Sequence, residues 1–208
     1  MFEGQLQTYY FDLFNVNYEY KSVIKVDNKY ELVDYFKENR QRFKELIAIY
    51  EGNLNDIGKN YHALSSTSLE GLKNKDNMAK LIQNNIYNWF RNIVKGKANL
   101  NMWTTIKAAK SKLKGNGYTK GFIACNCRST NEFKEKTNLA YVLNRFMNPL
   151  EKNFINRFGL DFDEDLFALS ELLQWIFRSA IRDDKPINIY IPSSRMRGLL
   201  IKWLDGEL

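Results

Sequence analysis

Short apolar segments alternate with longer helical segments from residue 100 onward, and this alternation constrains the fold more than any other feature. Residues 100–113 (LNMWTTIKAAKSKL) begin as a short strand and become polar and helical. Residues 121–126 (GFIACN) and 187–192 (INIYIP) are compact apolar runs bounded by turn residues, which is typical of buried strands. Strands separated by helices predict an α/β fold, with a largely parallel sheet flanked by helices on both faces and GFIACN as a central strand.

The helices of this region carry their own start and stop signals. Residues 138–149 (NLAYVLNRFMNP) predict a helix that ends at Pro149. A second helix, residues 165–183, follows the acidic stretch DFDED and has arginines near its C-terminal end, as the helix dipole favours. The acids of DFDED fit the solvated first turn of this helix better than a metal site. Residues 193–204 (SSRMRGLLIKWL) predict a final helix with a serine cap.

The first part of the chain predicts a β-hairpin and then helices. Residues 5–27 alternate in the manner of two strands on either side of Asn15-Val16-Asn17. Residues 29–50 place apolar side chains at helical spacing, and a further helix is expected within residues 65–94.

Length and composition fit one domain, or one domain with an appendage. The chain has 208 residues, of which 44% are hydrophobic and 26% charged, and its three prolines mark no clear linker. We expect residues 1–98 to form an N-terminal hairpin and helical region packed on the same domain, and residues 99–208 to form the α/β lobe.

Several classes of protein and site are disfavoured. No apolar run reaches about 18 residues and the N-terminus lacks signal-peptide character, so we expect a cytoplasmic protein. Cys125 and Cys127 are two residues apart in an expected strand, where they would point to opposite faces and remain reduced thiols. His62 is the only histidine, which disfavours zinc sites and histidine-dependent catalysis, and no metal ligands are predicted.

Positive charge is concentrated in the middle of the chain. The net charge is +7, but residues 73–128 carry twelve Lys and Arg residues against Asp76 alone, a local net charge of +11. Such an excess attracts polyanions by counterion release, and five aromatic residues within it are possible stacking surfaces: Trp89, Phe90, Trp103, Tyr118 and Phe122. This pattern favours nucleic-acid binding, with DNA as the expected partner. The alternative is a solvated lysine-rich face whose aromatic residues lie in the core.

Candidate binding residues follow the expected strands, because ligands of parallel sheets gather at the carboxyl ends of the strands. One such place is residues 126–133, and the other is residues 192–197. The predicted nucleic-acid-binding residues are Asn126, Arg128, Thr130, Asn131, Lys112, Lys114, Lys120 and Arg195.

A polar stripe is expected on helix 165–183. Gln174, Arg178 and Arg182 are four residues apart, so on one helix they would share a face and could meet phosphate oxygens. The alternative is a structural set of salt bridges between these arginines and Asp183, Asp184 or Glu171.

Motifs for nucleotide hydrolysis are absent from the sequence. There is no GxxxxGK[ST] loop, no GxGxxG, and no acidic pair after an apolar strand that would hold magnesium. We therefore expect this chain alone to be unable to bind and hydrolyse a nucleotide.

Three stretches, residues 102–133, 139–149 and 168–204, together resemble the C-terminal RecA-like lobe of superfamily 2 helicases, in the form carried by bacteriophages and related mobile elements. The resemblance covers about residues 100–204. It implies that another lobe or chain holds most of an ATP and its Mg²⁺. It also implies that Gln174 and one arginine, Arg178 or Arg182, act at that ATP as the catalytic group.

The resemblance has two departures. The family's late motif has its second arginine three residues after the first, whereas Arg182 comes four residues after Arg178, and Phe177 stands where glycine is common. The first lobe of the helicase is missing from this chain. By the same likeness, Asn126, Arg128 and Thr130 match the segment that couples nucleotide to the bound strand.

Two functions remain open from the sequence. The first is a helicase second lobe that binds DNA and supplies arginines to an ATP site completed by another polypeptide. The second is a stand-alone phage-type nucleic-acid-binding or host-interaction protein without ATPase activity. An independent nuclease or transferase is disfavoured, because no acid cluster, nucleophile and base pair, or cofactor loop supports it.

Overall fold

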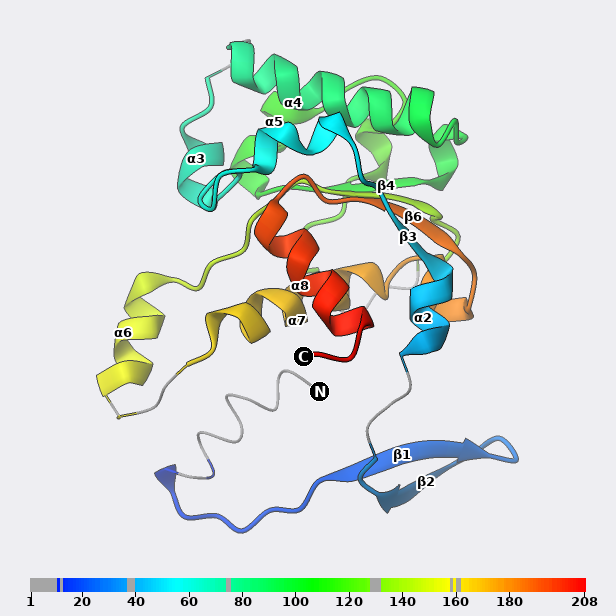
Figure 1. Cartoon of the computed structure of the whole chain (residues 1–208), viewed down its shortest axis with the longest axis vertical. Coiled ribbons are helices and arrows are strands. Elements are labelled where there is room, and N and C mark those ends of the chain that lie inside the picture. The colour runs from blue at the N-terminus through cyan, green and yellow to red at the C-terminus, as the bar shows by residue number, and fades with distance from the viewer. Residues whose placement is uncertain are drawn as a thin grey trace.

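The protein is built on a four-stranded parallel sheet with helices on both faces, as a computed structural model shows (Figure 1). The structure describes residues 11, 13–36, 40–73, 76–127, 132–157, 159 and 162–208. The strand order is β3-β6-β5-β4, and a separate antiparallel pair, β1-β2, precedes the sheet in the chain. The predicted α/β fold is therefore confirmed.

The described elements are as follows. The strands are β1 Lys21–Val26, β2 Lys29–Asp34, β3 Ile47–Ile49, β4 Asn101–Thr104, β5 Asn138–Tyr141 and β6 Ile187–Tyr190. The α-helices are α2 Gln41–Leu46, α3 Ser66–Glu70, α4 Asn77–Asn88, α5 Lys110–Leu113, α6 Pro149–Arg157, α7 Glu164–Ile176 and α8 Ser194–Leu204. The short helical turns are η1 Asn53–Gly58, η2 Trp89–Ile93, η3 Ala98–Leu100, η4 Lys107–Ala109, η5 Thr119–Gly121 and η6 Ala180–Asp183.

Two layers of helices enclose the sheet. On one face, which we call the α4 face, Trp89 packs against Tyr190 of β6 with ring centroids 5.9 Å apart. On the other, the α7 face, Trp175 packs edge-on against Tyr141 of β5 at 5.3 Å. Figure 1 shows α3, α4 and α5 on the first face, and α2, α7 and α8 on the second. Burial of both sheet faces is what a parallel sheet requires.

The helix starts expected from the sequence in the last third are confirmed. The carboxylate of Asp163 accepts hydrogen bonds from the backbone N–H groups of Asp165 and Leu166, both at 2.9 Å, and so caps α7. Ser193 caps α8 by accepting from the Met196 N–H at 3.4 Å. The first of these contacts agrees with the interpretation of DFDED as a helix start.

The prediction of a helix over residues 138–149 is wrong. Residues 138–149 do not form a helix: Asn138–Tyr141 are the interior strand β5, and its hydrophobic residues Leu139, Ala140 and Tyr141 are fully buried. A continuous apolar run of this length fits a doubly buried strand and a buried helix equally well, so periodicity could not separate them.

The segment GFIACN is not a central strand, and that prediction is wrong. It lies beside the edge strand β4, where Phe122 makes an isolated parallel bridge with Trp103. The Ile123 N–H donates to the Trp103 carbonyl at 3.0 Å, and the segment then leaves the sheet in a turn in which the Cys127 N–H donates to the Ala124 carbonyl.

The N-terminal region also differs from the prediction. Residues 29–50 are not one helix but β2, α2 and β3 in succession. The hairpin pairs Lys21–Val26 with Lys29–Asp34 and turns at Asp27 and Asn28, whose φ angles of 46° and 66° suit a tight two-residue turn. The expected hairpin turn at Asn15–Asn17 is therefore wrong, and residues 5–10 of that prediction lie outside the described residues.

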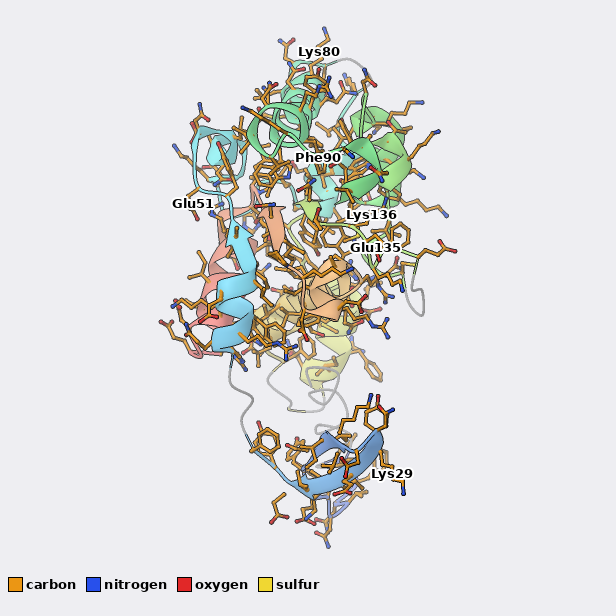
Figure 2. The ribbon with its side chains drawn as sticks, turned by 90° about the vertical axis from the view of Figure 1, so that its right-hand side faces the viewer. Lys29, Glu51, Lys80, Phe90, Glu135 and Lys136 are labelled. Carbon is orange, nitrogen blue, oxygen red and sulfur yellow. The ribbon has the colours of Figure 1, made fainter. Side chains whose placement is uncertain are left out.

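The two strands of the hairpin lie apart from the sheet in both views of the molecule (Figures 1 and 2). Large apolar side chains on it are exposed, among them Val23, Tyr30 and Leu32. Within the described ranges, no helix is long and apolar enough to cross a membrane.

The division of the chain at residues 98 and 99 runs through the sheet. Strand β3 lies before that division, yet it pairs with β6 in parallel from Ile47↔Ile187 to Ile49↔Ile189. The N-terminal helices α3 and α4 likewise lie on the sheet formed by the later strands (Figure 1).

Helix α7 ends at Ile176, so the expected single helix to residue 183 is wrong. Ser179 is extended at φ −84° and ψ −169°, and its hydroxyl donates to the Ile176 carbonyl at 2.7 Å. A side-chain hydrogen bond to the backbone of this kind competes with helix continuation. Arg178 lies in this turn and Arg182 lies in η6, so neither shares a helix face with Gln174.

Gly58 lies where the carboxyl ends of β3 and β6 meet, and it leaves no room for a side chain. A Cβ at this position would lie 2.0 Å from the carbonyl oxygen of Pro192. The Pro192 carbonyl is part of the backbone and cannot move aside as a flexible side chain could. We therefore expect Gly58→Ala to lower the free energy of unfolding by about 2–3 kcal/mol in urea denaturation. Gly198→Ala in α8 is the control, since nothing lies within 4 Å of its added Cβ, and it should be neutral or stabilising by about 0.5–1 kcal/mol. Equal stability of the two variants would contradict this packing.

Candidate nucleic-acid interface

The positive charge of the middle segment is solvent-facing and lacks acidic partners. The sequence contains no Asp or Glu between Asp76 and Glu132. Among the described residues, none of the lysines from Lys80 to Lys120 has a carboxylate within 4.0 Å. We call them the basic surface: Lys80, Lys95, Lys97, Lys107, Lys110, Lys112, Lys114 and Lys120. Among the described residues, these lysines therefore form no salt bridge, and Asp76 interacts electrostatically with Lys112.

A groove lies within part of this surface, and two of its lysines, Lys114 and Lys120, line it. It has a volume of about 1000 Å³ and is lined by Ala98, Asn99, the stretch Lys114–Gly121, and Lys136. We call it the lysine groove, after Lys114, Lys120 and Lys136. It lies beside the amino ends of β4 and β5, because η3 leads directly into β4 and Lys136 is two residues before the start of β5. In Figure 2, Lys136 lies below the green segment, from which blue-tipped side chains project outward.

A buried tyrosine anchors the loop that forms one wall of the groove. Tyr118 is 2% exposed, and its hydroxyl donates to the Leu113 carbonyl at 2.6 Å. Burial raises the pKa of this hydroxyl well above its usual value, so it remains a donor. Gly117 has φ +81°, and a Cβ on Gly121 would lie 2.1 Å from the Asn101 carbonyl oxygen. The glycines let the loop turn tightly against β4 while Lys114 and Lys120 stay exposed.

Lys136 is a groove residue that the sequence did not reveal. Its ammonium donates to the Asn99 carbonyl at 2.5 Å, and partial burial lowers its pKa. Lys136 comes after the basic stretch that ends at Arg128, and its backbone carbonyl accepts from the Ala180 N–H. The sheet brings it beside Lys114 and Lys120, and no local pattern in the sequence marks it.

Three asparagines join the amino ends of the strands next to the groove. The Asn138 amide donates to the Asn101 side chain at 3.2 Å, and the Asn188 amide donates to the Asn138 side chain at 3.4 Å. The Asn101 amide in turn donates to the Gly117 carbonyl at 3.1 Å. Asn101 and Asn138 are buried, and the hydrogen bond from Asn101 to the Gly117 carbonyl connects the groove loop to the sheet.

Most of the aromatic residues of the basic segment are core residues. Trp89, Phe90, Trp103 and Tyr118 are each 3% exposed or less. Phe122 is half-buried beneath the Lys110 ammonium, which lies 4.4 Å from its ring centroid. The expectation that these four buried rings offer stacking surfaces is therefore wrong, since base stacking needs an exposed ring face.

The predicted binding residues occupy different surroundings. Lys114 and Lys120 line the groove, whereas the half-buried Lys112 donates to the Glu70 carbonyl at 3.0 Å. Asn126 is exposed in the turn that follows Ile123. The predictions for Arg128, Thr130 and Asn131 lie outside the described residues.

Arg195 links three elements at the carboxyl edge of the sheet, and its side chain is only 5% exposed. Its guanidinium donates to the Asp165 carboxylate at 2.8 Å, the Asn144 side chain at 3.1 Å and the Arg145 carbonyl at 2.7 Å. It also lies 4.5 Å from the centroid of the Phe146 ring. These contacts make Arg195 part of the packing between α7, α8 and the chain after β5.

The three residues of the expected polar stripe are not aligned by the structure. Gln174 donates to the Ser170 hydroxyl at 3.4 Å, and Arg182 is exposed on η6. In the part of the chain that the structure describes, the buried Nε of Arg178 has no hydrogen-bond partner.

Two carboxylates considered as partners for the stripe bond elsewhere. Asp184 pairs with Arg42, and Glu171 lies 3.5 Å from Arg145. The segment that follows α7 lies near the amino edge of the sheet, since the Ala180 N–H donates to the backbone carbonyl of Lys136, just before β5. Asn126, in contrast, follows a segment that leaves β4 at the carboxyl edge.

No group of three or more His, Cys, Asp or Glu side chains in the described ranges could hold a metal ion. Cys125 and Cys127 are both free thiols, and burial raises the pKa of Cys125.

The parallel sheet and its two helical layers define a Rossmann-like α/β domain, and comparison with known proteins gives the same class. Residues 41–204 match the family described as "YonV C-terminal Rossmann-like domain", and the chain belongs to that family. The matched range begins at α2 and so includes β3 with the rest of the sheet. These comparisons support the Rossmann-like fold expected from the sequence, and they do not support the resemblance to a helicase lobe.

A relative from Bacillus subtilis (strain 168), "SPbeta prophage-derived uncharacterized protein YonV", is 46% identical over 211 residues. The alignment covers 100% of this chain and 51% of the relative, so the chain spans about half the length of the protein it matches. The relative is prophage-derived, which agrees with the phage-type origin expected from the sequence. No solved structure matches the chain.

Proposed function

We propose that this domain binds nucleic acid through the phosphate backbone, with the lysine groove as the principal contact. The observation that carries the proposal is a groove of about 1000 Å³ lined by Lys114, Lys120 and Lys136. The groove opens within a surface whose other lysines also lack carboxylate partners in the described part of the chain. Uncompensated ammonium groups of this kind bind polyanions by releasing their condensed counterions.

The chemistry of the groove favours binding without sequence preference. Lysine ammonium groups are compact point charges suited to phosphate oxygens, and contacts with phosphates carry no information on base sequence. The buried Trp89, Trp103 and Tyr118 offer no stacking platform. Binding that rests on charge alone should tolerate changes of base sequence, and it should weaken steeply with salt.

A salt titration tests the proposal. We expect the logarithm of the association constant for DNA of unrelated sequences to fall linearly with the logarithm of salt concentration. Each neutralised phosphate contributes a slope of about −0.9 on duplex and about −0.7 on single-stranded DNA, so contacts from the groove and its neighbours predict a slope of about −3 to −6. Fluorescence anisotropy at 50–300 mM salt measures it. Affinity that does not change with ionic strength would refute a phosphate-tracking role.

Helicase function remains a prediction within this proposal. It requires a separate ATP-binding lobe, with ATP and Mg²⁺ held mainly by that lobe, because the sequence has no phosphate-binding loop. The prediction assigns the reaching arginine to Arg178 or Arg182. If it holds, ATPase activity reconstituted with a phosphate-loop partner should be lost in Arg178→Ala or Arg182→Ala while DNA binding persists.

A further inference from the structure

The connections after β4 and β5 diverge to opposite faces of the sheet. Strand β4 continues into η4 and α5, and α5 packs with α4 on the α4 face. Strand β5 continues toward α7, whose Trp175 packs on Tyr141 on the α7 face. In open α/β sheets, the carboxyl ends of two adjacent strands whose connections part in this way enclose a crevice that takes ligands.

Both strands end in a buried hydroxyl that has no hydrogen-bond partner among the described residues. Thr104 and Tyr141 are register partners at the ends of β4 and β5, so their side chains lie on the same face. Both residues are 0% exposed, and neither hydroxyl has a hydrogen-bond partner among the described residues. Buried polar groups in native proteins nearly always have a partner, so these two hydroxyls indicate a missing one.

A third donor comes from Arg145, which follows β5. Its buried Nε also has no hydrogen-bond partner in the described part of the chain, while its terminal nitrogen lies 3.5 Å from the Glu171 carboxylate on α7. The Glu171 contact orients the guanidinium and leaves Nε–H as a donor. Arg145 and Glu171 both lie close enough to Tyr141 to influence the pKa of its hydroxyl.

All three groups act as donors, which defines the ligand they would accept. An arginine Nε–H can only donate. Burial raises the pKa of Tyr141 far above its ordinary value, so its hydroxyl keeps its proton at neutral pH. The hydroxyls of Thr104 and Tyr141 can both donate, so a ligand group rich in acceptor oxygens satisfies all three at once.

We propose that the carboxyl ends of β4 and β5 form a small-molecule site, in which Thr104, Tyr141 and Arg145 donate to the oxyanion of a phosphate- or carboxylate-bearing ligand. The site is separate from the lysine groove, which lies at the amino ends of the same strands. It does not depend on nucleic-acid binding. Charge-assisted donation from an arginine to an oxyanion is among the strongest hydrogen bonds available to such a site.

Thermal unfolding of the chain with and without ligand tests the proposal, with inorganic phosphate, ATP and citrate as separate probes at millimolar concentration. We expect at least one probe to raise the Tm of the unaltered chain by a few degrees. Tyr141→Phe removes an unpartnered hydroxyl, so it should leave the Tm without ligand unchanged or higher while abolishing the ligand-induced rise.

Tyr190→Phe is the matched control. Tyr190 is a buried tyrosine of β6 on the opposite face, and its hydroxyl donates to the Leu54 carbonyl at 2.6 Å. This variant should lower the Tm without ligand by a few degrees and keep the ligand-induced rise.

The outcomes separate the possible sources of a response. A rise with phosphate and ATP but not citrate identifies a phosphate ligand, and a rise with citrate alone identifies a carboxylate. The groove variant Lys114→Ala/Lys120→Ala/Lys136→Ala should keep the rise, which separates this site from the groove. No rise with any probe, or a full rise in Tyr141→Phe, would overturn the proposal.

Discussion

Replacing Lys114, Lys120 and Lys136 together by alanine is expected to weaken DNA binding by about 100-fold at 0.15 M salt. Each lysine that contacts a phosphate adds about 0.7–0.9 to the magnitude of the salt slope, so the variant should also lose about 2–3 units of slope. Fluorescence anisotropy over a range of salt concentrations measures both quantities. The exposed Lys114 and Lys120 should contribute little to the unfolding free energy. Loss of the hydrogen bond from Lys136 to the Asn99 carbonyl should lower it by about 1 kcal/mol.

The matched control removes the same charge from another part of the molecule. Lys44, Lys59 and Lys152 each lie within salt-bridge distance of a carboxylate, of Asp205, Asp56 and Glu164 respectively. Their triple alanine variant has the same net charge as the groove variant. We expect its affinity to fall less than 10-fold, since only long-range attraction is lost. Equal losses in the two variants would show that net charge matters and the groove does not.

Arg195→Ala is expected to lower the free energy of unfolding by about 2–4 kcal/mol, because it removes a nearly buried guanidinium from several hydrogen bonds at once. The Asn144 side chain and the Arg145 carbonyl would lose a donor, and the ring of Phe146 would lose its cationic neighbour. Urea denaturation measures the change. Arg195→Lys should recover little of it, since one ammonium cannot reach the same set of acceptors.

Arg91→Ala is the control for this prediction, because Arg91 is exposed and has no carboxylate partner in the described ranges. It should change the stability by less than about 0.5 kcal/mol. The sequence placed Arg195 in the nucleic-acid-binding set. An Arg195→Ala variant of unchanged stability with weakened DNA binding would support that interpretation over a structural role.

The parts of the fold that sequence predicted well are those with local chemical signals. Helices α7 and α8 begin at Asp163 and Ser193, whose side chains bond the first turn, and such caps depend on a few neighbouring residues. Strand β6 is flanked in the sequence by Pro186 and Pro192, and these two prolines marked its limits. The alternation of these elements was sufficient for the fold class.

The errors occurred where long-range pairing decides the structure. Residues 138–141 become a strand because β4 and β6 flank them on both sides, and this pairing leaves no local trace. Ile47–Ile49 form a strand and do not continue helix α2, because they pair in parallel with β6. The short-range periodicity of both segments was compatible with a helix, so tertiary contacts overrode it.

The candidate site was predictable in part. Lys114 and Lys120 were found because local charge is visible in the sequence, whereas Lys136 joins them only through the sheet. The predicted polar stripe is wrong because α7 ends before Arg178. The Ser179 hydroxyl donates to the Ile176 carbonyl, and this hydrogen bond competes with continuation of the helix. The unpartnered hydroxyls of Thr104 and Tyr141 belong to two different strands, and only their register places them together.

Lysine footprinting tests the central claim most directly, since it locates bound DNA on the protein. The chain is acetylated briefly with and without saturating DNA at 50 mM salt, and the modification of each lysine is measured by peptide mass spectrometry. The account predicts that DNA slows the acetylation of Lys114, Lys120 and Lys136 several-fold and leaves Lys44, Lys59 and Lys152 unchanged. Protection of the second set, or equal protection of both sets, would contradict it.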